Sequence, residues 1–186
     1  SPNEIKRGTV INLNGELWVT ADFQRVSPGK GGSFVRAKVK SLSSGKVVEQ
    51  VFKSAETLTF EQVSHKKMQF IFSDADTLTF MDGQTFEQVM LGKDLVGDDE
   101  KYLKEGLDVT VTMHNDSPIS MELPGKIEYP ITETEPAVKG DTTSGNVTKE
   151  ATAGNGLMIR VPIFVKVGDI VRINTETGDY SERVSK

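Results

Sequence analysis

Apolar and polar residues alternate along most of the chain, in short runs that end in turn residues. Between residues 34 and 42, Val35, Ala37 and Val39 occupy alternate positions, and cations fill the positions between them. A period of two residues is typical of strands with one buried face. This pattern, with turns such as Asn14-Gly15, predicts strands over 9–13, 16–23, 34–42, 47–52, 67–72, 77–81, 85–91, 107–113, 119–123, 127–132, 157–167, 170–174 and 179–184. The spacing predicts an all-β protein built of barrels or sandwiches.

Three segments depart from this pattern. Residues 98–105 begin with acids that suit a helix N-terminus and are followed by Gly106, so they predict one short helix. Residues 134–156 are rich in Gly, Thr and Ser and lack an apolar period, which predicts a long loop of the functional or mobile kind. Pro162 cannot donate a hydrogen bond to a neighbouring strand, so its strand is expected at an edge or at a bulge.

Turns and charge divide the chain into three parts. Residues 1–63 carry 9 Lys or Arg and 6 acids, net +3; residues 64–127 carry 6 and 12, net -6; residues 128–186 carry 7 and 9, net -2. An acidic middle beside a basic first third argues against nucleic acid coating the whole surface, but it leaves room for local contact with phosphate. We therefore predict three domains, 1–63, 64–127 and 128–186.

The composition fits a soluble, folded chain of 186 residues and excludes several kinds of site. Because Cys is absent, a disulfide scaffold, a thiolate zinc site, an iron–sulfur cluster and a Cys nucleophile are excluded. No apolar run approaches the roughly 18 residues of a membrane span, and a signal-peptide core is lacking, so the expected location is the cytoplasm. The two histidines, His65 and His114, lack metal-ligand spacing, and phosphate-loop and nucleophile-elbow motifs are absent. We predict no metal, no cofactor and no enzymatic activity.

A lysine in a glycine-rich turn is the strongest candidate for function. The turn reads SPGKGG over residues 27–32, with Lys30 at its centre. Glycine lets a backbone turn tightly and approach a partner closely, and Pro28 stiffens the entry. Lys30 would project alone from such a tip, as a charged probe or as a target of modification. From spacing alone, a solvated hairpin lysine is the commoner interpretation.

Two motifs far apart in the chain resemble bacterial translation elongation factor P. The first is DFQRVSPGKGGSFVR over residues 22–36, which contains the Lys30 turn. The second is Lys149-x-Ala151-x4-Gly156-x2-Ile159-x-Val161-Pro162-x2-Val165-x2-Gly168, which fits the family's third-domain signature at every fixed position. Segments 80–82, 85–88, 133–136 and 139–142 resemble family segments in the same order, so the resemblance spans essentially the whole chain.

The resemblance implies a fold of three small β-barrels in an L shape. The first barrel of this family is SH3-like, also described as KOW-like, and the other two are of the oligonucleotide-binding type. The short helix predicted above falls in the middle domain. Because the chain has a third domain, it is not assigned to the archaeal and eukaryotic relatives, which have two domains.

The resemblance also implies a function. The family consists of monomeric, non-enzymatic translation factors that bind the 70S ribosome between the P and E sites and relieve stalling at consecutive prolines. Lys30, usually lengthened by a modifying enzyme, would contact P-site peptidyl-tRNA in the peptidyl-transferase centre. The lysine argues against the arginine-glycosylating branch. Membrane and DNA are not among the implied partners.

Further residues could support Lys30 or contact the ribosome and its RNA. Pro28, Gly29, Gly31 and Gly32 would support the lysine loop. The cations Arg25, Arg36, Lys38 and Lys40 could hold tRNA phosphates, although exposed strand faces also carry charge for solubility. The loop that approaches E-site messenger RNA is matched by Gly140, Asp141 and Thr142. Contacts with the small subunit are matched by Tyr180 and Arg183, for which an ordinary edge strand is the alternative.

Two other functions remain open on the sequence. An elongation-factor-P-like paralogue would share the fold, although the intact 28–31 and 140–142 segments favour the factor itself. A general single-stranded RNA-binding module could be built from the same barrels, but it would be expected to carry stacking aromatics on an open basic face. The acidic middle third argues against that module.

Overall fold

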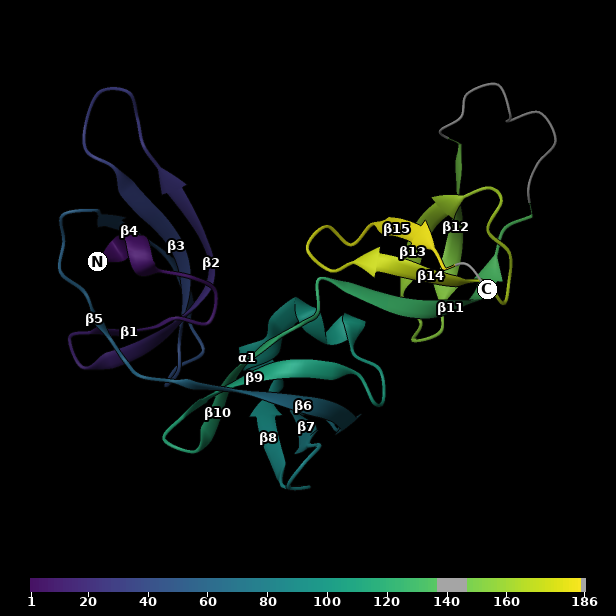
Figure 1. Cartoon of the computed structure of the whole chain (residues 1–186), viewed down its shortest axis with the longest axis horizontal. Helices are drawn as coiled ribbons and strands as arrows, with labels where there is room; N and C mark the ends of the chain where they lie inside the picture. The colour runs from purple at the N-terminus through teal and green to yellow at the C-terminus, as the bar shows by residue number, and fades with distance from the viewer. Residues whose placement is uncertain (137–146, 185–186) are drawn as a thin grey trace. The chain divides into compact units, whose positions relative to one another are not determined.

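The computed structural model describes residues 1–136 and 147–184 of the chain. Strands make up 55% of the structure and helices 7%. The strands form three antiparallel five-stranded sheets that follow one another along the sequence (Figure 1). The expectation of an all-β protein is therefore confirmed.

The first sheet has the order β4-β3-β2-β1-β5. Its strands are β1 (Val10–Leu13), β2 (Glu16–Val26), β3 (Phe34–Ser41), β4 (Val47–Lys53) and β5 (Thr59–Phe60). The alternation predicted over 34–42 is confirmed, because Val35, Ala37 and Val39 are fully buried in one cluster with Phe52. The short 3₁₀ helix η1 (Pro2–Glu4) precedes Ile5, which belongs to the same core.

The second sheet has the order β10-β9-β6-β7-β8. Its strands are β6 (Ser64–Ser73), β7 (Thr77–Asp82), β8 (Gln88–Gly92), β9 (Asp108–His114) and β10 (Ser117–Glu122). Phe70 and Phe80 meet edge to face in its interior, with ring centroids 5.8 Å apart. A register shift in β6 between Phe70 and Phe72 adds one residue, so Phe70 points inward and Phe72 outward.

The third sheet has the order β13-β12-β11-β14-β15. Its strands are β11 (Lys126–Thr134), β12 (Thr148–Ala153), β13 (Met158–Pro162), β14 (Ile170–Asn174) and β15 (Tyr180–Arg183). Pro162 ends β13, which lies at an edge of the sheet, so the position predicted for this proline is confirmed. The predicted strand over 157–167 is too long, since the chain turns after Pro162.

Thr134 is the last residue of β11, and the prediction of an unbroken loop over 134–156 is also wrong for residues 148–153. These residues form β12, which lies between β11 and β13. Its core-facing positions are Lys149, Ala151 and Ala153, all buried. Small or charged residues at those positions hide the apolar period by which strands are detected.

The predicted helix over 98–105 is also misplaced. A single α-helical turn, α1 (Lys93–Val96), comes earlier, and Gly97, with φ +65°, ends it. A 3₁₀ helix, η2 (Gly97–Tyr102), follows directly, so the acids at 98–100 lie in its first turn rather than at an α-helical N-cap. The expectation of one short helix in the middle third holds, with these new limits.

Contacts divide the chain into two compact units. The first contains residues 1–97 and 105–122, and the second contains residues 98–104 and 123–186. Within the first unit, Val10, Val19 and Ile119 form one buried cluster that joins the first and second sheets. Because this division differs from the three predicted domains, the limits 1–63, 64–127 and 128–186 stay a prediction.

Hydrogen bonds explain why residues 98–104 belong to the second unit. The buried phenol of Tyr129 donates to the carbonyl oxygen of Tyr102, and Asn155 Nδ2 donates to the Lys101 carbonyl oxygen at 2.7 Å. Lys104 Nζ donates to the Glu128 carbonyl oxygen. Burial raises the pKa of the Tyr129 hydroxyl, which favours its neutral, donating form.

Candidate functional site

Residues 27–33 form an exposed loop between β2 and β3, at the end of a hairpin that extends beyond the rest of the first sheet (Figure 1). The last cross-strand pair is Val26 with Phe34, and the Ser27 and Ser33 hydroxyls lie 3.1 Å apart at the base of the loop. Within the described part of the chain, Lys30 makes no hydrogen bond or ion pair. The loop therefore presents its lysine to solvent, as predicted from the glycines around it.

The backbone needs glycine at only one position of this loop. Gly31 has φ +115°, a conformation that L side chains rarely adopt. Gly29 and Gly32 have no such angle, and a Cβ at either would meet open space. Pro28 Cγ lies 3.9 Å from the place of a Cβ at Gly31. The expectation that glycine is needed for a tight backbone turn therefore applies to Gly31 but not to Gly29 or Gly32.

The outer face of β3 carries the predicted cations, but acids from neighbouring strands lie among them. The Arg36 guanidinium is 3.2 Å from the Glu49 carboxylate of β4. In the strand register, Lys38 lies between Asp22 of β2 and Glu49. Lys40 is half-buried, which lowers the pKa of its ammonium, and the Asp94 carboxylate opposes that shift. The stripe is consequently less positive than the sequence of β3 alone indicates.

Sequence reasoning missed Glu49 and Asp22 as part of this face. The signal was present, because the turn at 43–46 fixes the pairing of β4 with β3, and alternation then places Glu49 beside Lys38.

Arg25 is engaged within its own domain. One of its guanidinium nitrogens donates to the carbonyl oxygens of Asn3, at 2.8 Å, and Ile5, at 3.1 Å. Its guanidinium carbon also lies 4.9 Å from the centroid of the Phe23 ring. These contacts tie η1 to β2, a role that the sequence did not indicate.

On the third sheet, Tyr180 and Arg183 lie on the edge strand β15. Arg183 Nη1 is 3.6 Å from the Asp169 carboxylate, and its guanidinium carbon is 4.9 Å from the centroid of the Phe164 ring. Tyr180 is half-buried, and burial raises the pKa of its hydroxyl. The exposed ring of Phe164 was not singled out from the sequence. The predicted residues Gly140, Asp141 and Thr142 lie outside the described residues.

The two histidines have structural contacts within the first unit. His65 Nδ1 lies 3.1 Å from the Thr112 hydroxyl, and His114 Nε2 lies 3.5 Å from a Glu61 carboxylate oxygen. Glu61 also accepts a hydrogen bond from Asn12 Nδ2 at 3.2 Å. Over residues 1–136 and 147–184, His, Asp and Glu side chains form no group suited to a metal ion.

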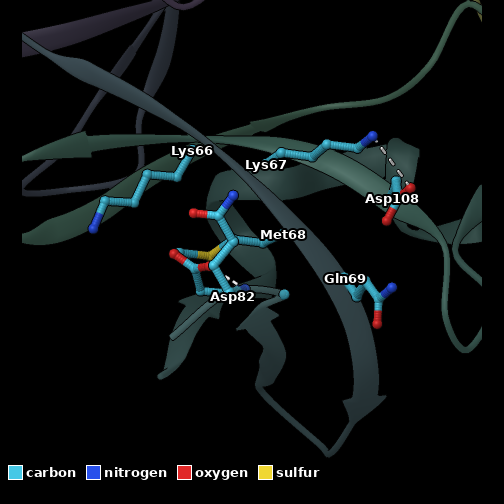
Figure 2. A pocket seen from close by; sticks show the side chains of 8 residues that line it. Lys66, Lys67, Met68, Gln69, Asp82 and Asp108 are labelled. Atoms are coloured by element: carbon cyan, nitrogen blue, oxygen red, sulfur yellow. Dashed lines mark hydrogen bonds and ion pairs between the residues drawn. The ribbon is translucent and has the colours of Figure 1, made fainter. Parts of the chain in front are cut away.

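A pocket of about 500 Å³ at the second sheet does not gather its polar groups at one point. Figure 2 shows Lys66 and Lys67 pointing in opposite directions, and Lys67 Nζ is 3.5 Å from Asp108. Asp82 accepts hydrogen bonds from the backbone N–H groups of Gln84 and Thr85, which lower the pKa of its carboxyl. These contacts stabilise a turn, so we assign the pocket no ligand.

Profiles of known protein domains match the chain from end to end. The elongation factor P KOW-like domain matches residues 1–58, the elongation factor P OB domain matches 63–121, and the elongation factor P C-terminal domain matches 127–183. Elongation factor P of Bifidobacterium longum (strain DJO10A) is 44% identical over 181 residues, 97% of this chain and 96% of that protein. The chain belongs to the elongation factor P family. Elongation factor P of Moorella thermoacetica is 41% identical over 183 residues, 98% of each chain.

Family membership confirms the fold class read from the sequence, with a KOW-like domain followed by an OB domain. It also makes the chain a translation elongation factor by family. A solved structure, eukaryotic translation initiation factor 5A from Methanococcus jannaschii, is 19% identical and covers 66% of this chain and 89% of that one. Its TM-score of 0.39 is too low to support an argument. In the described ranges, no helix has the length and hydropathy of a membrane span.

Proposed function

We propose that this translation elongation factor binds the ribosome between the P and E sites and promotes peptide-bond formation at consecutive prolines, with Lys30 as its working residue. The observation that best supports this proposal is the exposed loop that contains Lys30. Lys30 is exposed, lies in a hairpin loop held by the Ser27 and Ser33 hydroxyls, and makes no hydrogen bond or ion pair in the described structure. A lysine that does nothing for its own fold is available to a partner.

The chemistry that this loop supports is orientation. Proline is a constrained nucleophile, and holding the end of peptidyl-tRNA in a reactive geometry lowers the entropic part of the barrier. An ammonium on a four-carbon stem offers three donors to RNA oxygens. Covalent extension by a modifying enzyme would increase its reach, and the exposure of Lys30 leaves room for such an enzyme. The protein itself performs no bond-making step in this proposal.

The cations of β3 would hold tRNA phosphates beside the lysine. Lys38 is exposed, and Arg36 keeps guanidinium donors beyond the one that faces Glu49. Arg25 is the weakest member of the proposed set, because its guanidinium already donates to two backbone carbonyls. We therefore rank Lys38 and Arg36 ahead of Arg25 and the half-buried Lys40 as phosphate contacts.

The third sheet would contribute further contacts on the ribosome. Tyr180 and Arg183 are proposed to meet the small subunit, and Gly140, Asp141 and Thr142 to approach the E-site codon. The guanidinium of Arg183 is about half exposed and lies over the Phe164 ring, which supports the assignment of Arg183 as a contact with the small subunit. The protein is proposed to act as a monomer in the cytoplasm, without a cofactor.

The test measures the rate of peptide-bond formation through consecutive prolines in a reconstituted system. Protein from its native host is compared with Lys30→Ala and with Lys46→Ala. Lys46 is the matched control, because it is also exposed, follows a glycine and lies at a hairpin turn of the same sheet. Stimulation lost in Lys30→Ala and kept in Lys46→Ala would support the proposal. Equal stimulation by all three proteins, or none by the native protein, would overturn it.

A further inference from the structure

The part of the second sheet's outer surface formed by β6, β7 and β8 contains a group of uncharged residues, bordered by Asp108 of β9, which pairs with Gln69, and by Lys67 of β6. Cross-strand pairing places Gln69, Met81 and Gln88 in one row, and Phe72, Thr79 and Met90 in the next. We call these six residues the uncharged face. None of the six can ionise, although charged residues make up 26% of the chain.

The second row of the uncharged face is an exposed apolar patch. Phe72 is 50% exposed and Met90 is 66% exposed, while Thr79 between them is only 3% exposed. The bulge in β6 is responsible, because it turns Phe72 away from the core that holds Phe70 and Phe80. Single exposed apolar residues are common, whereas exposed apolar residues gathered on one surface are typical of an interaction site. Phe72 and Met90 share one row, two strands apart.

The charges around this face argue against RNA as its ligand. In oligonucleotide-binding folds the second and third strands, here β7 and β8, commonly bind nucleic acid, and such binding needs cations near phosphate. Acids flank the face instead, with Asp74 and Asp76 before β7, and Asp82 and Glu87 at the turn into β8. The backbone hydrogen bonds to Asp82 hold its pKa low and keep it anionic.

Three lysines lie near these acids, fewer than the acids themselves, and Lys93 is the one that directly follows β8, beside Asp76. Lys67 is paired with Asp108, and Lys66, which Figure 2 shows pointing away from Lys67, contributes to the lowered pKa of Asp82 after the backbone hydrogen bonds. The outer face of the first sheet differs, since Arg36, Lys38 and Lys40 lie on it. The first sheet thus offers a face of mixed charge that includes three cations, whereas the six residues of the uncharged face include none.

We propose that the uncharged face is a docking site for a basic protein of the ribosome. The partner brings an apolar side chain onto Phe72 and Met90, and its Lys or Arg residues meet the acids at the two ends of the face. This charge complementarity selects a protein with a basic rim and rejects phosphate. The inference rests on the proposed function, since it presumes that the ribosome is the binding partner.

The test combines photo-crosslinking with affinity. A benzophenone amino acid replaces Met90 in the full chain, and the same replacement at Met158 is the control. Met158 is a methionine of nearly equal exposure, 67%, on the third sheet. Each protein is irradiated on purified 70S ribosomes that carry P-site tRNA, and the products are identified by mass spectrometry with and without ribonuclease.

We expect position 90 to crosslink to a protein rich in Lys and Arg. The double variant Phe72→Gln, Met90→Gln is expected to bind ribosomes about tenfold more weakly than the native chain. Met158→Gln is expected to bind as the native chain does. Because all three residues are exposed, unfolding curves of these variants should overlay that of the native protein.

Several results would overturn the docking site. The first is a crosslink from position 90 to RNA. The second is no crosslink above background together with unchanged ribosome affinity of the double variant. The third is a loss of ribosome affinity in Met158→Gln as large as that in the double variant. Failure of the proposed function is a separate result. The proposed function itself is wrong if the native chain does not bind ribosomes. It is also wrong if Lys30→Ala stimulates peptide-bond formation through consecutive prolines as well as the native chain does.

Discussion

The guanidinium of Arg36 and the carboxylate of Glu49 form an ion pair of 3.2 Å across β3 and β4, on the face proposed to meet tRNA. The Arg36 guanidinium also lies 6.0 Å from the Phe34 ring centroid. Both charged side chains are about half exposed, so solvent screens the pair and its contribution to stability is small. Its consequence for function is larger, because an acid placed among phosphate-binding cations repels RNA.

Removing this acid should strengthen ribosome binding. For Glu49→Gln we expect a free energy of unfolding within about 1 kcal/mol of the native value. Ribosome affinity should rise about two- to fivefold at low salt, since Arg36 and Lys38 are released toward phosphate, and the gain should shrink as salt is added. Glu133→Gln, an exposed acid on β11, is the control and should change affinity less. Weaker binding by Glu49→Gln would show that the acid itself contacts the ribosome.

The two glycines beside Lys30 should respond differently to alanine. Gly31→Ala forces a side chain into φ +115° and should cost about 1 kcal/mol or displace the lysine. Gly29→Ala meets open space at an ordinary angle and should leave stability unchanged or slightly raised. Urea unfolding followed by fluorescence of Trp18, the one tryptophan of the chain, reports on the first sheet. The rate of peptide-bond formation through consecutive prolines should fall in Gly31→Ala only. An equal fall in both variants would contradict a requirement for glycine at position 31 alone.

Arg25 should matter for stability whatever its role on RNA. Arg25→Ala removes hydrogen bonds to the Asn3 and Ile5 carbonyls and the stack on Phe23, a loss of about 1–3 kcal/mol. Arg25→Lys keeps the charge without the guanidinium geometry and should recover only part of the loss. Trp18 fluorescence during urea unfolding and hydrogen exchange of residues 1–9 would measure both effects. Native stability in Arg25→Ala would contradict the anchoring role.

The strands that could be predicted are those whose core positions are large and apolar. Val35, Ala37 and Val39 signal β3 directly, whereas β12 presents Lys149, Ala151 and Ala153 to the core and gives no such signal. The acids at 98–100 suggested a helix start, but Gly97 with φ +65° had already ended α1, and a backbone angle is not visible in residue types.

In the candidate site, too, some features could be predicted from the sequence and others could not. The exposure of Lys30 followed from the local glycine pattern, which needs no tertiary information. The engagement of Arg25 by Asn3 and Ile5, and of Arg183 by Phe164, joins residues distant in sequence. Such contacts depend on the packing of whole elements, so the residues alone could not reveal which cations are already occupied.

The hydrogen bond from Tyr129 to the Tyr102 carbonyl gives a further prediction, because it holds η2 against the third sheet. Tyr129→Phe leaves a carbonyl oxygen without its donor at a buried position and should cost about 1–3 kcal/mol. Amide hydrogen exchange in residues 98–104 should accelerate, while exchange in β1 to β4 should stay unchanged. Thr132→Val, which removes an exposed hydroxyl that donates to the Thr152 carbonyl, is the control for loss of a hydroxyl from the same strand.

The same phenol predicts how stability depends on alkaline pH. Burial raises the pKa of Tyr129 above its ordinary value of about 10, so the unfolded chain releases this proton before the folded chain does. The stabilisation is complete below pH of about 10 and is lost as the pH rises above it. Unfolding of the native chain and of Tyr129→Phe should therefore differ most near neutral pH and converge in alkali. A difference that stays constant between neutral and strongly alkaline pH would contradict a buried, neutral Tyr129.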